Sequence, residues 1–264
     1  RPPPPPRPAP SHTAVAVMGR KGRAGEAPPA TTAEDPTLAG FLRFMEENQV
    51  DWTGLEIRGG AAREDTRGRA YSVYAKKAIA VDTEIARMPK AAIISSRTTG
   101  IRDAIEGAGL VGGMALTLAL MYEIALGSKS PWAGYIAIMP SHEPTLLYWS
   151  EEELAELEGT ELEGQAARDR ADLTSDYEAH IAPLVRGDAR LACLPVAATG
   201  IEAYTAAASL VASRSFGVDD WHGEAMVPLA DMFNHKTAGE HIHFMDEDSD
   251  DEEGTSEGPE GDDG

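Results

Sequence analysis

Reactive side chains are concentrated in residues 226–244, where they alternate with apolar ones more closely than anywhere else in the chain. A short apolar run leads to Asp231, Asn234 and His235, and a strand-like alternation follows at residues 241–244. This pattern predicts a strand, a turn that carries polar side chains, and a second strand. The turn is the leading candidate for a functional site.

Metal binding is one chemistry that this turn offers. Asp231, His235, His241 and His243 are all permitted metal ligands, and a strand would place His241 and His243 on one face. Histidines in a turn more often serve as hydrogen-bonding groups, and no familiar set of metal-binding carboxylates accompanies them in the sequence. We therefore predict no bound metal and keep a metal site as the minor alternative.

Nucleophilic catalysis and phosphate binding lack their usual sequence patterns. Ser213 and Ser215 lie near His222 but outside a G-x-S-x-G elbow. Cys193 is the only cysteine, which excludes an intrachain disulfide, and its apolar neighbours predict an inert buried thiol. The glycine-rich segments lack the lysine of a P-loop, so they predict turns.

The elements that must position the turn are predicted from apolar spacing and helix caps. They are a helix at residues 38–45, short strands between residues 55 and 94, a mostly helical middle from residue 112, and a helix at residues 201–216 that leads to the turn. Ser150 and Glu153 have the spacing of a capping box. The longest apolar stretch, residues 110–126, is short for a bilayer, which needs about 20 residues, so it predicts a buried helix and no membrane contact.

Both ends of the 264-residue chain are predicted to be disordered. Residues 1–36 are rich in proline, alanine and glycine, and residues 246–264 hold eleven acidic and no basic side chains. The formal net charge of −21 argues against direct nucleic-acid binding and favours basic partners. The first residues are basic but lack the apolar core of a signal peptide, so we expect a cytoplasmic or nuclear protein, with a plastid or mitochondrion as the alternative.

The chain resembles a SET-domain protein-lysine N-methyltransferase, of the branch that includes the Rubisco large-subunit and ribosomal-protein lysine methyltransferases. The similar segments follow one another in the expected order over about residues 37–245. They are residues 40–44, 73–75, 79, 87–90, 118–120, 130–132, 135, 157–161, 208–216 and 226–244, of which the last two ranges are specific.

The resemblance implies an α+β fold, in which a SET-type core of short strands carries a mostly helical insertion at about residues 98–195. An incomplete SET domain would occupy residues 37–245, and its core would thread one segment through a loop. S-adenosylmethionine is the implied cofactor. The implied partner is a protein that carries the target lysine, ribosomal or otherwise basic, and the enzyme is expected to be a monomer.

The resemblance also assigns cofactor-binding roles to named residues. Asn234 and His235 would bind S-adenosylmethionine together with Ala70, Tyr71 and Ser72. The last three stand where the family usually has glycines, because the backbone there must approach the cofactor closely.

A channel for the substrate lysine is implied at Ser213, Arg214 and Asp231. Methyl transfer is an in-line displacement, so the donor and the lysine must approach from opposite faces. Lysine has a pKa of about 10.4 and attacks only when neutral, a form that apolar walls beside a sulfonium would favour. Without the resemblance, Arg214 and Asp231 are also explained as a salt bridge that closes a helix end.

One part of the family pattern is missing from this sequence. The catalytic tyrosine of the family, in a segment similar to Asn-Thr-Tyr-Gly, would follow residue 244, but acidic residues stand there instead. We therefore expect a fragment that ends before its catalytic residue and shows weak or no turnover. The alternative is a non-catalytic SET remnant that binds the cofactor or a protein.

Overall fold

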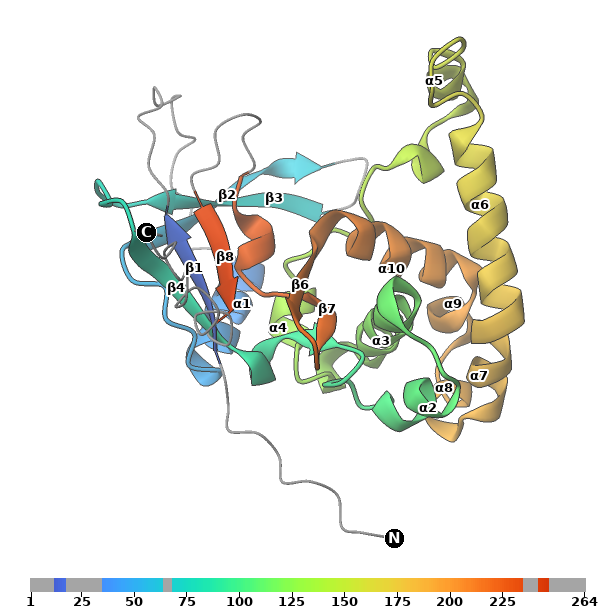
Figure 1. Cartoon of the computed structure of the whole chain (residues 1–264), viewed down its shortest axis with the longest axis horizontal. Coiled ribbons are helices and arrows are strands. Elements are labelled where there is room, and N and C mark those ends of the chain that lie inside the picture. The colour runs from blue at the N-terminus through green and yellow to red at the C-terminus, as the bar shows by residue number, and fades with distance from the viewer. Residues whose placement is uncertain (1–11, 18–34, 64–67, 235–241, 247–264) are drawn as a thin grey trace, which may run out of the picture.

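The computed structural model describes residues 12–17, 35–63, 68–234 and 242–246. Short strands gather on one side of the molecule and helices on the other (Figure 1). This mixture confirms the predicted α+β class. None of the helices in the described part of the chain is long and apolar enough to cross a membrane.

The described strands form three small antiparallel sheets. The first has the order β4 (Thr83–Pro89), β1 (His12–Val17), β8 (Ile242–Asp246); the second pairs β2 (Leu55–Arg63) with β3 (Gly68–Ala75); the third has the order β5 (Ile94–Ser95), β7 (Gly223–Met226), β6 (Ser215–Asp219). Strand β1 therefore joins the two ends of the described chain, because it pairs with β8 on one edge and with β4 on the other.

Strand β1 corrects the prediction that residues 1–36 are disordered. Its sequence, His-Thr-Ala-Val-Ala-Val, is rich in residues that suit a pleated surface. Pairing on both edges satisfies its backbone groups, which composition alone does not reveal. The rest of the predicted N-terminal disorder, before His12 and at residues 18–34, and the acidic segment 247–264 lie outside the described residues.

The predicted first helix is confirmed as α1 (Pro36–Glu47). Asp35 caps it by accepting hydrogen bonds from the backbone N–H groups of Thr37 and Leu38, and the proline occupies the first turn, where its missing N–H costs nothing. Asn48 ends the helix as expected. The buried face consists of Leu38, Phe41, Phe44 and Met45.

Helices fill the chain between β5 and β6. They are α2 (Arg102–Gly107), α3 (Gly112–Leu126), α4 (Ala133–Ile136), α5 (Glu151–Ala155), α6 (Gln165–Asp176), a π turn (Tyr177–Ile181), α7 (Ala182–Gly187), α8 (Ala189–Ala192), α9 (Val196–Thr199) and α10 (Ile201–Arg214). The predicted capping box is present at the start of α5. Helices α5 and α6 stand out from the body as an arm (Figure 1).

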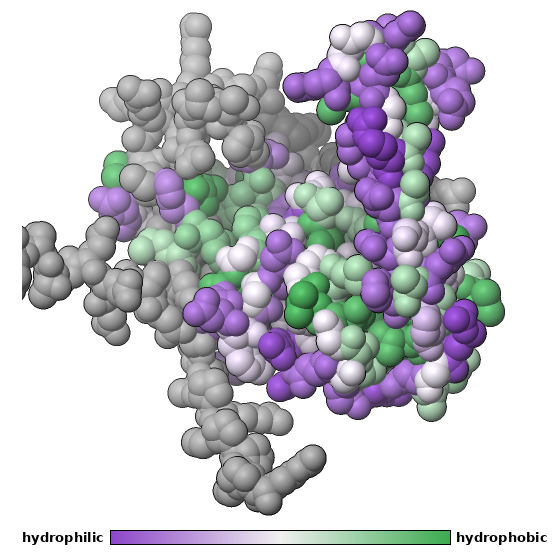
Figure 2. Space-filling model, turned by 45° about the vertical axis from the view of Figure 1, so that its right-hand side comes forward, coloured by the Kyte–Doolittle hydropathy of each residue, from purple (hydrophilic) through white to green (hydrophobic). Residues whose placement is uncertain are grey.

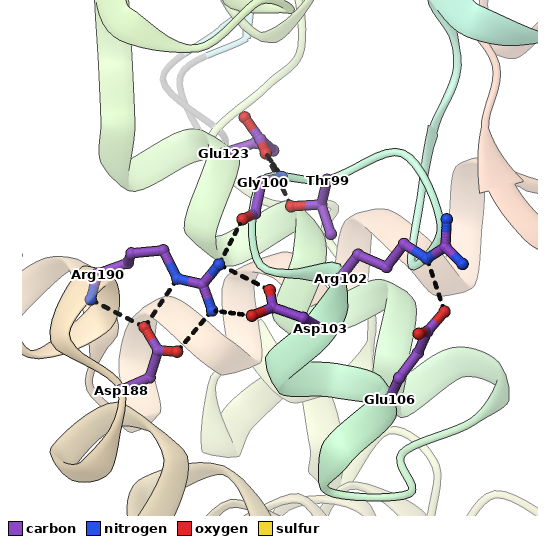
Figure 3. Close-up of polar contacts among 8 residues, drawn as sticks. All are labelled: Thr99, Gly100, Arg102, Asp103, Glu106, Glu123, Asp188 and Arg190. Atoms are coloured by element: carbon purple, nitrogen blue, oxygen red, sulfur yellow. Dashed lines mark hydrogen bonds and ion pairs between the residues drawn. The ribbon is translucent and has the colours of Figure 1, made fainter. Parts of the chain in front are cut away.

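Helix α3 is the predicted buried helix, and it carries one buried carboxylate. Glu123 is 1% exposed and accepts hydrogen bonds from Thr99 Oγ1 at 2.8 Å and the Gly100 backbone N–H at 3.2 Å (Figure 3). It also accepts one from Ser130 Oγ at 2.8 Å. These bonds offset the cost of burying the charge and fix the loop after β5. Ser130 Oγ also accepts a 3.2 Å hydrogen bond from the backbone N–H of Trp132, just before α4 begins at Ala133.

A cluster of charged side chains joins α8 to α2. Arg190 contacts Asp188 at 2.6 Å, Asp103 at 2.7 Å and the Gly100 carbonyl oxygen at 2.9 Å (Figure 3). Cys193, two residues after the buried Leu191, is exposed, so the prediction of a buried thiol is wrong. The side chain of Leu191 faces the core, whereas that of Cys193 faces the solvent.

Candidate active site

The two segments predicted to bind the cofactor meet although 162 positions separate them. Ser72 Oγ on β3 donates a hydrogen bond of 3.4 Å to Asn234 Oδ1. Asn234 follows the 3-10 turn η5 (Ala230–Met232), which lies beside β3. Both side chains are accessible, and a bond of this length in water is weak. A ligand could therefore replace it at little cost.

Tyr71, by contrast, directs its side chain away from Asn234. Its hydroxyl donates a 2.9 Å hydrogen bond to Asp35 Oδ2, the residue that caps α1. Its ring lies against Gly59, where an added Cβ would be 3.3 Å from Tyr71 Cε1. Successive residues of a strand face opposite sides, so Ser72 and Tyr71 cannot share one face. Tyr71 therefore offers only its backbone to the side where Asn234 lies.

The other predicted cofactor-binding residues are Ala70 and His235. Ala70 lies in β3, and its side chain is outside the described part of the structure, as is all of His235. Their cofactor roles stay predictions.

Arg214, at the end of α10, is held between two carboxylates. Its Nη2 lies 2.6 Å from Glu143 Oε1, and its Nη1 lies 3.1 Å from Asp231 Oδ2. Its Nε also donates to Glu143 Oε1, at 2.8 Å. The Ser209 hydroxyl accepts from the backbone N–H of Glu143 at 3.0 Å, which fixes the loop that carries this residue.

This ion cluster is largely removed from water. The side chains of Arg214, Glu143 and Asp231 are 18%, 10% and 1% exposed. Burial raises the pKa of the Asp231 carboxyl, although Arg214 acts against the shift. Burial opposes the charge of Arg214, but the two carboxylates still raise its pKa above the usual value. One guanidinium thus lies between two carboxyl groups in a largely buried cluster.

Tyr135 on α4 lies next to Asp231 at the buried side of the cluster. It is fully buried and packs against Phe41 and Phe44. Burial first, and then the charge of Asp231, raises the pKa of its hydroxyl, which stays neutral. Among the residues that the structure describes, neither the Tyr135 hydroxyl nor Asp231 Oδ1 has a hydrogen-bond partner. These two neighbouring buried groups are a polar site that a small movement would satisfy.

The predicted channel residues come together as a contact between the end of α10 and η5. Ser213 is exposed beside Arg214. Because the Asp231 side chain is buried while the residue is only partly buried, its accessible atoms are backbone atoms. The salt bridge that sequence reasoning offered as the alternative is present, so Arg214 and Asp231 have at least a structural role. Their contact with a lysine stays a prediction.

Sequence reasoning missed Glu143 and the site role of Tyr135. Glu143 lies in an irregular segment after α4, 71 positions from Arg214, and no local pattern marks it. Position 135 was named only among the segments that resemble the family. Spacing reports which face is buried, and it does not report what the buried hydroxyl meets.

A metal site gains no support from the described residues. They contain no group of three or more histidine, cysteine, aspartate or glutamate side chains placed to hold an ion. Asp231 is engaged by Arg214, and His243 lies in β8, paired with Ala16. His235 and His241 are outside the described ranges.

Comparisons with known proteins identify relatives for most of the chain, although no family model matches it. It is 28% identical over 197 residues to "N-lysine methyltransferase setd6" of Xenopus tropicalis, covering 67% of this chain and 43% of that protein. The human protein SETD6, also named an N-lysine methyltransferase, is 27% identical over 62% of this chain and 38% of its own length. The chloroplastic Rubisco large-subunit N-methyltransferase of Nicotiana tabacum is 25% identical over 77% of this chain and 40% of its own length.

Solved structures show the same architecture. The SET domain of LSMT bound to lysine and AdoHcy superimposes with a TM-score of 0.64 at 19% identity, over 81% of this chain and 51% of that one. Rubisco LSMT bound to AdoMet gives a TM-score of 0.60 at 23% identity, over 77% and 45% of the two chains. The chain spans less than half the length of the curated relatives it matches.

Proposed function

We propose that this chain, which has the fold of a SET domain and is similar to N-lysine methyltransferases, forms the cofactor- and lysine-binding part of an S-adenosylmethionine-dependent protein-lysine N-methyltransferase. The relatives with this fold are methyltransferases by name, and solved examples hold AdoMet, AdoHcy or lysine. Two groups of described residues support the proposal: Ser72 with Asn234, and Ser213 with Arg214 and Asp231.

The observation that carries the proposal is the meeting of Ser72 with Asn234. An accessible hydroxyl and an accessible amide offer both donors and acceptors, which suits the carboxylate and ammonium groups of S-adenosylmethionine. When bound, S-adenosylmethionine supplies an activated methyl group on a sulfonium. The task of Ser72 and Asn234 is to bind and orient the amino-acid end of the molecule.

Arg214, Glu143 and Asp231 serve the substrate side of the proposed site. The two carboxyl groups around Arg214 suit the approach of a basic side chain, while the buried apolar residues of η5 and the preceding turn, Leu229, Ala230 and Met232, keep water away. The Asp231 carboxylate lies behind Arg214, so its role is to position Arg214 and the neighbouring backbone. Beside the cofactor, the positive sulfonium and the apolar residues favour the neutral form of the lysine, whereas a nearby carboxylate would favour the ammonium form.

The protein substrate is proposed to be basic, as the net charge of −21 favours, and a ribosomal protein is one candidate of that chemistry. The monomeric state and the compartment stay predictions. The chloroplastic relative keeps an organelle open as the alternative to the cytoplasm and nucleus.

Isothermal titration calorimetry with S-adenosylmethionine tests the cofactor site. Asn234→Ala should weaken binding about tenfold, since one hydrogen bond to a charged group contributes about 1.5 kcal/mol or more. Ser72→Ala should weaken it about threefold. Ser175→Ala, which removes an exposed hydroxyl on α6, serves as the matched control and should bind like the wild type. Equal binding by wild type and Asn234→Ala would contradict the assignment.

A further inference from the structure

A groove of about 420 Å³ lies between α6 and the second half of α10. Apolar side chains, among them Leu147, Leu173 and Ala208, form much of its lining. Three aspartates of α6 also line it: Asp169, Asp172 and Asp176. They recur at intervals of three and four residues, so they share one face of the helix. The groove thus combines an apolar floor with an acidic wall.

The acidic wall is not neutralised by basic side chains nearby. Residues 151–176 hold ten acidic residues and two arginines. Arg170 donates to the carbonyl oxygens of Leu147 and Trp149, and Arg168 binds Gln165 and a carbonyl oxygen. Asp172 and Asp176 have no ion pair among the described residues. The surface of the α5–α6 arm is accordingly hydrophilic beside a more apolar body (Figure 2).

One residue of the groove, Ser209, connects it to the Arg214 cluster. Ser209 lines the groove and accepts from the backbone N–H of Glu143, and Glu143 holds Arg214. Ala208 and Arg214 are six residues apart on one helix, which corresponds to about 9 Å. This separation along the helix axis is one that a few residues of an extended polypeptide can span.

We propose that this groove docks a lysine or arginine side chain of the protein substrate, from the segment that flanks the target lysine. A basic side chain matches it in both parts, because its aliphatic stem covers apolar surface while its charged end reaches the aspartates. The inference rests on the proposed function, since the occupant is part of the methylated protein. It adds a second recognition site outside the channel.

The test measures binding of a fluorescein-labelled peptide of alternating lysine, arginine and glycine by fluorescence anisotropy. The double variant Asp172→Asn/Asp176→Asn should weaken binding about tenfold, the sum of two partly exposed ion pairs. The matched control, Glu46→Gln/Glu178→Gln, removes two exposed acids outside the groove and should change affinity less than twofold. The difference between the two double variants should shrink at 0.5 M salt, because salt screens exposed charges.

Three results would overturn the docking proposal: no binding of the basic peptide, equal losses in both double variants, or self-association of the chain that the groove variant alone abolishes. The last result, seen by analytical ultracentrifugation, would assign the groove to a second copy. Calorimetry with S-adenosylmethionine on the same groove variant separates this proposal from the proposed function. Unchanged cofactor binding with unchanged peptide binding refutes the groove alone, and failure of the wild type to bind the cofactor refutes the proposed function.

Discussion

Glu143 is the residue whose replacement probes the ion cluster most sharply. It accepts two hydrogen bonds from Arg214, from Nε at 2.8 Å and from Nη2 at 2.6 Å, in a site where both side chains are largely buried. Glu143→Gln keeps an oxygen acceptor but removes the charge, which should lower the free energy of unfolding by about 1 kcal/mol. Glu143→Ala leaves two buried N–H groups without a partner, and should cost about 3 kcal/mol.

Urea denaturation followed by circular dichroism measures both losses, with Glu178→Gln as the control for an exposed glutamate. The loss in free energy of unfolding should be larger for Glu143→Ala than for Glu143→Gln. Changes of less than 0.5 kcal/mol for both would show that the cluster is loose and exposed in solution. A larger loss of stability for Glu143→Gln than for Glu143→Ala would show that unpartnered Arg214 N–H groups do not determine the cost.

Two further predictions concern charge and packing. Burial would raise the pKa of Asp219, but the ion pair with Lys90 lowers this pKa to about 2, below the unfolded value of about 3.9. The ionised Asp219 therefore contributes about 2 kcal/mol to stability above pH 4. This contribution is lost as the pH falls towards 2. Thermal melts of Asp219→Asn should therefore show a deficit at pH 7 that vanishes near pH 2, and a constant deficit would contradict the pKa. An added Cβ at Gly134 would lie 2.7 Å from the Gly40 carbonyl oxygen, so Gly134→Ala should destabilise by about 1–3 kcal/mol. Gly107→Ala, in a helix with open space, should instead be neutral or stabilising, and equal effects of the two would refute the close approach of α1 and α4.

Local patterns predicted several helices because their signals lie within a few residues. The apolar spacing of α1, the apolar run of α3 and the capping box of α5 each act within a few turns, whereas α2 and the largely polar α6 were not predicted individually. The resemblance also named Ser72 and Asn234, and the structure brings these two side chains together. The binding of S-adenosylmethionine by these two residues stays a prediction that a binding measurement tests.

Long-range contacts were out of reach of the same reasoning. Strand β1 depends on partners at residues 83–89 and 242–246, and without them its short run of small and β-branched residues resembles a linker. The expected strand at residues 91–94 is mostly a 3-10 turn, Lys90–Ala92, followed by the two-residue β5. Glu143 gained its role only when folding placed it against Arg214.

The most direct test of the central claim is a crystal structure of this chain with AdoHcy. We expect AdoHcy beside β3 and η5, with its amino-acid end within hydrogen-bonding distance of Ser72 or Asn234. AdoHcy bound elsewhere, with the Ser72–Asn234 contact intact and facing water, would contradict the account.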